Sequence, residues 1–86
     1  MSILEQVQKV IAEEFELPLA RVTATAKLHE DLDLDSLDAI DLIVLLEQTF
    51  GVSVSEEVAK SLLSVDEVTT YVEQLLAQRD TVALAG

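Results

Sequence analysis

Helix-start signals recur along this chain, and they constrain it to a helical fold. Ser2 is followed three residues later by Glu5, and Ser64 is followed by Glu67 at the same spacing. In such a capping box the two side chains bond the backbone N–H groups that a helix start leaves free. Asp35, another favoured capping residue, precedes a further helical pattern. The sequence therefore indicates a series of short helices.

The first two helical segments have predicted ends. The first is expected to stop at Pro18, because the residue before a proline avoids the α conformation. The second begins at Asp35 or Ser36 and reaches about Phe50, where Gly51 can adopt the left-handed stop. Apolar residues recur at helical spacing in the first segment: Ile3, Val7, Val10, Ile11 and Phe15.

The last two helical segments differ in length. The third is short and lies between Ser53 or Ser55 and Leu62 or Leu63. The fourth opens at Ser64, and its apolar face consists of Val65, Val68, Val72, Leu75 and Leu76. We expect residues 1–79 to form one domain and residues 80–86 to fray, because this small, apolar tail lacks a cap.

A long segment without helical period, from Leu17 to Asp35, separates the first two helices. The alternation of Asp and Leu over residues 31–35 also fits a strand, but a single strand has no partner here, so we expect an extended loop. Three leucines can pin this loop to the core: Leu28, Leu32 and Leu34. The predicted fold is all-α, a small four-helix bundle of three longer helices and one short third helix, with a long loop between helices one and two.

The chain is strongly acidic, with 17 acids, five Lys or Arg residues and a net charge of −12. Residues 28–59 contain no Lys or Arg and hold nine of the acids: Glu30, Asp31, Asp33, Asp35, Asp38, Asp41, Glu47, Glu56 and Glu57. Nucleic-acid binding requires a basic surface, and anionic membranes repel acidic proteins, so both partners are excluded. A surface of this charge either keeps a protein soluble or steers basic partners toward it.

Composition excludes several kinds of chemistry. The absence of cysteine removes disulfides, thiolate zinc sites and a cysteine nucleophile. A self-contained serine hydrolase is excluded, because His29 is the only histidine and no G-x-S-x-G motif occurs. The longest apolar run, residues 42–46, is too short to span a membrane, and the N-terminus lacks the basic start of a secretory signal. We therefore expect a cytoplasmic protein.

Three alternating acids match the start of a calcium-binding loop. Asp31, Asp33 and Asp35 occupy the positions of its first three ligands. The match then fails, because Ser36 stands in place of the required glycine and Leu42 in place of the bidentate glutamate. We therefore expect no dedicated metal site and no catalytic residue.

The second helix carries more apolar surface than one core face needs. On a helical wheel, one arc consists of Ala39, Leu42, Ile43, Leu46 and Phe50. A second arc, beside Ser36 and bordered by acids, consists of Leu37, Ile40 and Val44. Either another helix or the long loop covers this second arc, or it forms a partner-binding strip with an acidic rim.

Ser36 lies in the first turn of this helix, directly after the long loop. Free backbone N–H groups and the helix dipole favour an anion at such a position. The serine therefore either helps to cap the helix or carries a phosphate-linked group. Spacing alone favours the cap.

The sequence of residues 34–38, Leu-Asp-Ser-Leu-Asp, resembles the attachment motif of acyl carrier proteins, and the helix order of nearly the whole chain is similar to that family. The resemblance implies that a phosphopantetheinyl transferase uses coenzyme A to attach 4'-phosphopantetheine to Ser36. The resulting thiol would carry acyl groups as thioesters, and Asp35 would assist the magnesium-dependent modification. The resemblance also implies a carrier without catalytic activity, whose apolar interior shelters an acyl chain.

The resemblance further implies a surface that docks onto basic patches of partner enzymes. These partners are the transferase, ketosynthases and other acyl-handling enzymes, and the carrier is expected to be a monomer. The positions that match the docking surface are Leu37, Asp38, Ile40, Asp41, Val44, Glu47, Glu56 and Glu57.

Several residues depart from the pattern of the family, and these departures bear on which pathway the carrier serves. Gln48 and Thr49 interrupt the acidic run of the second helix, Leu45 is bulky where a small residue is common, and Lys60 adds a base. The resemblance implies fatty acid or polyketide-type synthesis, with a dedicated polyketide, aryl-polyene or specialised lipid pathway as the alternative to the primary fatty acid one. From a different class, the alternative is an unmodified acidic helical adaptor that binds a basic partner.

Overall fold

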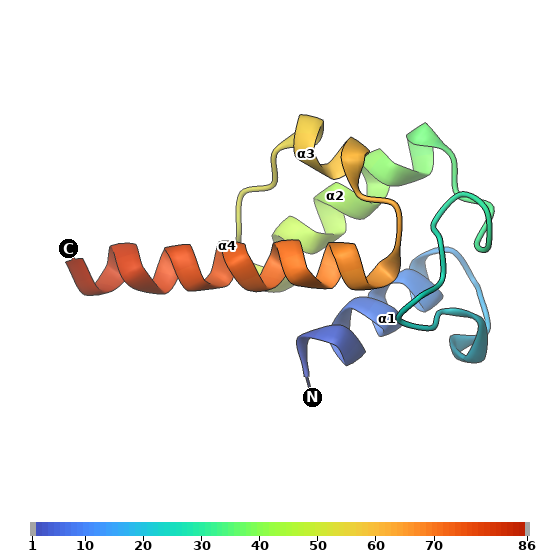
Figure 1. Ribbon diagram of the computed structural model, residues 1–86, viewed down its shortest axis with the longest axis horizontal. Coiled ribbons are helices and arrows are strands. Elements are labelled where there is room, and N and C mark those ends of the chain that lie inside the picture. The colour runs from blue at the N-terminus through green and yellow to red at the C-terminus, as the bar shows by residue number, and fades with distance from the viewer. Residues whose placement is uncertain (1, 86) are drawn as a thin grey trace.

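Four α-helices and a short 3₁₀ turn make up the computed structural model, which describes residues 2–85 and the side chains through residue 78. The elements are α1 (Ile3–Glu14), η1 (Leu19–Arg21), α2 (Ser36–Phe50), α3 (Glu56–Ser61) and α4 (Val65–Ala85). Helices α1, α2 and α4 pack on one another, and the short α3 lies against α2 (Figure 1). The predicted all-α bundle, with its long first loop, is confirmed. None of the described helices is long and apolar enough to cross a membrane.

Side-chain caps fix most helix boundaries where the sequence predicts them. The Ser2 hydroxyl accepts from the Glu5 N–H at 3.1 Å, and the Glu5 carboxylate accepts from the Ser2 N–H at 3.2 Å. At the end of α2, Gly51 adopts the expected left-handed conformation, with φ 64°. Of the two candidate starts for α3, Ser55 is the cap, and its hydroxyl accepts from the Val58 N–H.

The end of α1 differs from the prediction. The helix stops at Glu14, well before Pro18, because Glu16 adopts a left-handed conformation with φ 53°. The Leu17 N–H then donates to the Ala12 carbonyl at 2.9 Å, as in a Schellman ending. Since that ending normally uses glycine, nothing in the local sequence marks it.

The core lies where the three longer helices meet. Its buried side chains come from α1 (Val7, Ile11 and Ala12), from α2 (Leu42, Leu46 and Phe50), from α4 (Val65, Val68 and Val72) and from the long loop (Val22, Ala26, Leu32 and Leu34). Leu28 is partly buried against the same cluster. The predicted role of the loop leucines as anchors is therefore confirmed.

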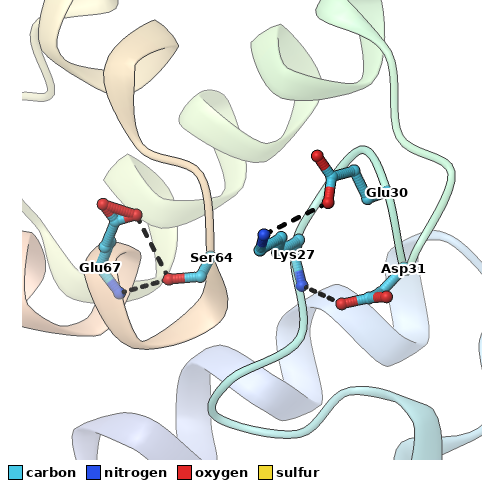
Figure 2. A network of polar contacts seen from close by, with 5 residues as sticks. All are labelled: Lys27, Glu30, Asp31, Ser64 and Glu67. Carbon is cyan, nitrogen blue, oxygen red and sulfur yellow. Dashed lines mark hydrogen bonds and ion pairs between the residues drawn. The ribbon is translucent and has the colours of Figure 1, made fainter.

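Backbone hydrogen bonds attach the long loop to the segment between α3 and α4. The Leu28 N–H donates to the Leu63 carbonyl at 2.9 Å, and the Val65 N–H donates to the Ala26 carbonyl at 3.0 Å. These bonds flank an isolated antiparallel bridge between residues 27 and 64, around which Figure 2 shows the polar side chains. The long loop is thus attached to the rest of the molecule. It is not extended throughout, because residues 27–33 form hydrogen-bonded turns.

The tail at the C-terminus lies at the limit of the described chain. The backbone of α4 is helical through Ala85. The fraying expected of residues 80–86 stays a prediction, and residue 86 lies outside the described residues.

Candidate functional site

Ser36 is the first residue of α2, and it does not cap the helix. The cap is Asp35, whose Oδ1 atom accepts from the N–H groups of Leu37 and Asp38, each at 3.0 Å. The Asp38 carboxylate accepts in turn from the Asp35 N–H at 3.1 Å. Ser36 itself is exposed, and within the described residues its hydroxyl has no hydrogen-bond partner. The cap that spacing alone favoured for Ser36 is thus supplied by its neighbour, which leaves the hydroxyl accessible.

The electrostatics of Asp35 follow from the cap. The donated N–H of Asp38 is the largest cause that holds the pKa of Asp35 below its ordinary value, followed by that of Leu37. Desolvation opposes this lowering of the pKa, and the nearby His29 adds to it. The carboxylate therefore keeps its negative charge beside the Ser36 hydroxyl, and its Oδ2 atom has no partner in the described part of the chain.

Ser36 borders a cleft of about 690 Å³ between the long loop, α2 and α3. Its apolar lining includes Leu34, Ala39, Leu42, Ile43, Leu46, Leu62 and Val68. His29 and Asp35 line the same cleft as Ser36. A group attached to the Ser36 hydroxyl would therefore begin at the edge of an apolar hollow that enters the bundle.

The second apolar arc of α2 is uncovered. Leu37 is 72% exposed, Ile40 41% and Val44 46%. The core arc is buried as predicted at Leu42, Ile43, Leu46 and Phe50, with Ala39 half-buried. Of the two interpretations that the sequence left open, coverage by another element is wrong, and an apolar strip lies exposed beside Ser36.

Comparison with known proteins identifies this arrangement. The sequence model of a family described as "Phosphopantetheine attachment site" matches residues 5–72. The chain is 41% identical over 73 residues to an acyl carrier protein of Helicobacter pylori (strain G27), across 85% of this chain and 94% of that protein. It is 43% identical over 75 residues to acyl carrier protein 2 of Ralstonia nicotianae, across 87% of this chain and 93% of that protein.

The chain belongs to the acyl carrier protein family. Membership implies a covalently attached phosphopantetheine, and acyl carrier proteins are carriers without catalytic activity that interact with acyl-handling enzymes. The residues present fit such a group, because an exposed serine hydroxyl without a partner stands at the edge of an apolar cleft.

The acids of this carrier that the sequence assigned to docking have different surroundings. Asp41 and Glu57 are exposed, and Glu56 is exposed with an ion pair to Lys60 at 3.4 Å. Asp38 is half-buried in the cap of α2. Glu47 is half-buried, and its Oε2 atom accepts from the N–H of Val54.

Sequence reasoning about this carrier missed two features of the site. Glu47 bonds the connector between α2 and α3, and the Tyr71 hydroxyl accepts from the Ser55 N–H at 3.0 Å in the same connector. The second feature is that Lys27, His29 and Lys60 line the cleft of Ser36. Both features join positions distant in the sequence, so no local pattern marks them.

Proposed function

We propose that Ser36 is the attachment site of the phosphopantetheine arm, and that the chain delivers acyl thioesters to enzymes of fatty acid or polyketide-type synthesis. The observation that carries this proposal is the free, exposed Ser36 hydroxyl at the edge of the apolar cleft. The family requires an attachment residue, and Ser36 stands in the motif that resembles it. We expect the exchange of cargo to take place in the cytoplasm.

The residues around Ser36 suit modification by a transferase. The Ser36 hydroxyl would form a phosphodiester with the phosphate of coenzyme A that bears the pantetheine, releasing the nucleotide, and its proton would pass to the transferase. Asp35 keeps its charge at this position, and its free Oδ2 atom suits a magnesium ion brought by the transferase complex. When bound, the arm supplies a thiol that holds acyl groups as thioesters.

The exposed strip of Leu37, Ile40 and Val44 supports docking to partner enzymes. Apolar side chains at the centre of an interface supply affinity, and the surrounding acids accelerate encounters with basic patches. Asp41, Glu56 and Glu57 are placed for this steering role. Contacts of this kind form and break quickly, which suits a carrier that is passed between enzymes.

Intact mass spectrometry tests the attachment site. The chain is incubated with coenzyme A, magnesium and a broad-specificity phosphopantetheinyl transferase, beside the variants Ser36→Ala and Ser53→Ala. Ser53 is an exposed serine outside the motif and serves as the matched control. We expect one added phosphopantetheine in the parent chain and in Ser53→Ala, and none in Ser36→Ala. A modified Ser36→Ala protein would contradict the proposal, and an unmodified, folded parent chain would favour an acidic adaptor.

A dedicated polyketide, aryl-polyene or specialised lipid pathway is the second candidate within the carrier class. The exposed Gln48 and Thr49, which end the acidic run of α2, favour it. Loading the modified carrier with acyltransferases of each pathway type separates the candidates. Preferential loading by a fatty acid enzyme would exclude the dedicated pathway.

A further inference from the structure

Basic side chains gather at the cleft of Ser36. The chain has five Lys or Arg residues and one histidine. Among the described side chains, Lys27, His29 and Lys60 line this cleft. Lys27 and Lys60 are also the nearest bases on either side of residues 28–59, which contain neither Lys nor Arg. The fold therefore brings Lys27 and Lys60, which are far apart in the sequence, to the same cleft.

Both lysines form ion pairs, and the partner of each is an exposed acid. The Lys27 Nζ lies 3.3 Å from a Glu30 oxygen (Figure 2), and the Lys60 Nζ lies 3.4 Å from a Glu56 oxygen. All four side chains are more than half exposed, at 58% and 68% in the first pair and 58% and 59% in the second. Exposed pairs of this kind contribute little, so either ammonium group can exchange its acid for another anion.

One nitrogen of the His29 ring forms a hydrogen bond, and the other has no partner among the described residues. Its Nδ1 lies 3.0 Å from the Leu34 carbonyl oxygen. A carbonyl only accepts, so Nδ1 carries the proton of this bond. The Nε2 atom has no partner within the described residues. Because Leu34 precedes Ser36 by two residues, the bond ties the ring to the backbone that leads into the attachment site.

The lysines at the cleft are already paired with acids. The cleft lining includes Lys27 and Glu30 from the long loop, Asp35 from the start of α2, and Lys60 from α3. Lys27 is paired with Glu30, and Lys60 is paired with Glu56, so the acids around the opening neutralise both ammonium groups. A protonated His29 would add a positive charge that no carboxylate of the described residues holds by a hydrogen bond.

Building on the proposed attachment to Ser36, we propose that His29 is a positioning residue for the phosphodiester of the arm. The Nε2–H of protonated His29 donates to a phosphate oxygen, and Lys27 and Lys60, which line the same cleft, add positive charge. The arm is thereby directed from Ser36 along the cleft between α2 and α3.

Nuclear magnetic resonance tests this role directly. A phosphodiester keeps one charge across the pH range in which histidine titrates, so any pH response of its ³¹P signal reports a neighbouring group. Because His29 is the only histidine, its ring signals need no assignment. We expect the ³¹P signal of the loaded carrier to move with pH, and the titration midpoint of His29 to rise upon loading.

Variants separate positioning from a structural role. His29→Asn retains a donor near the Nδ1 position that can bond the Leu34 carbonyl, but it has no counterpart of Nε2. We expect an unchanged melting temperature and a ³¹P signal that no longer responds to pH. Lys60→Gln should reduce the rise of the His29 midpoint. Lys9→Gln removes an equal charge from a different hollow, beside α1, and should leave the rise unchanged.

The remaining outcomes are distinguished by the cargo and by intact mass. If His29 responds only when the thiol carries a carboxyacyl group, and not with the free thiol or an uncharged acyl group, the anion is the cargo and the proposal is wrong. A loaded carrier whose ³¹P signal is flat with pH overturns the proposal while leaving the attachment intact. If the mass shows no loading, the attachment to Ser36 fails first, and the proposal fails with it.

Discussion

The Glu47 carboxylate on α2 accepts a hydrogen bond from the backbone N–H of Val54 at 2.9 Å. The next N–H, that of Ser55, donates to the Tyr71 hydroxyl on α4 at 3.0 Å. Two helices therefore hold consecutive backbone groups of the connector that leads into α3. Helix α3 has no buried residue of its own that could anchor it. These two bonds therefore hold the backbone at the point where α3 begins.

Removing the Glu47 acceptor should destabilise the fold. Glu47→Ala leaves the half-buried Val54 N–H without its partner, and we expect a loss of about 1–2 kcal/mol in the free energy of unfolding. Glu47→Gln should lose less, because its amide oxygen still accepts. Urea denaturation measures both, with Asp41→Ala, at an exposed position of the same helix, as the control. Equal losses in Glu47→Ala and Asp41→Ala would contradict the structural role.

Truncating Leu37 should weaken docking without affecting stability. Leu37 is 72% exposed in the strip beside Ser36, whereas Leu19 is 60% exposed in the long loop, far from this strip in sequence. We expect Leu37→Ala to reduce affinity for the transferase by roughly tenfold, the usual order for an interface anchor. Leu19→Ala is the matched control and should bind normally. Calorimetric titration compares them, and equal affinities of the two variants would exclude docking through the strip.

Acid should weaken the cap of α2. The folded pKa of Asp35 is lowered, so its stabilising contribution is fully present above its unfolded pKa, the ordinary value of 3.8. That contribution is lost as the pH falls through the lower folded pKa. Asp35→Asn still caps the helix but cannot titrate, so thermal melting should show a smaller loss of stability on acidification than in the parent chain. Identical acid sensitivity in the two proteins would rule out this contribution.

Glycine at position 33 should stabilise the loop before Ser36. Asp33 adopts a left-handed backbone with φ 59°, which is costly for a residue with a side chain. Asp33→Gly removes this cost, partly offset by greater freedom of the unfolded chain, so we expect a gain of at most about 1 kcal/mol. Asp33→Asn removes the same charge without changing the backbone preference as much. Chemical denaturation should rank Gly above Asn, and the reverse order would contradict the backbone explanation.

Salt should stabilise the whole domain. A net charge of −12 produces repulsion in the folded state, which ions screen over about 10 Å at 0.1 M ionic strength. We expect the melting temperature to rise with ionic strength, equally in sodium chloride and choline chloride. A melting temperature that stays flat in both salts would sink this expectation, and a rise in sodium alone would indicate specific ion binding.

Helix boundaries were predictable wherever a capping residue marks them. Asp35 and Gly51 define both ends of α2, and Ser2 defines the start of α1. The end of α1 was not predictable, because a glutamate takes the left-handed position that usually selects glycine. The attachment of the long loop also left no signal, since backbone groups make its bonds and any side chain permits them.

In the candidate site, too, some features could be predicted from the sequence and others could not. The second apolar arc of Leu37, Ile40 and Val44 followed from helical geometry, because two apolar arcs on one helix cannot both face one core. Its exposure did not follow from the sequence, because another element could have covered it. The surroundings of Glu47 and the grouping of Lys27 with Lys60 depend on how the connector, α3 and the loop meet in space. Long-range packing sets those contacts, so periodicity and spacing do not contain them.

The six residues of α3 all retain contact with solvent, so this helix adds little to the cooperative unit formed by the other three. Its amide protons should then exchange with solvent through local openings, at a lower free energy than unfolding of the bundle. We therefore expect the carrier to have two stabilities, a higher one for the three longer helices and a lower one for α3. Since α3 supplies part of the lining of the cleft, opening of α3 alone would widen the space beside Ser36 while the other three helices stay folded.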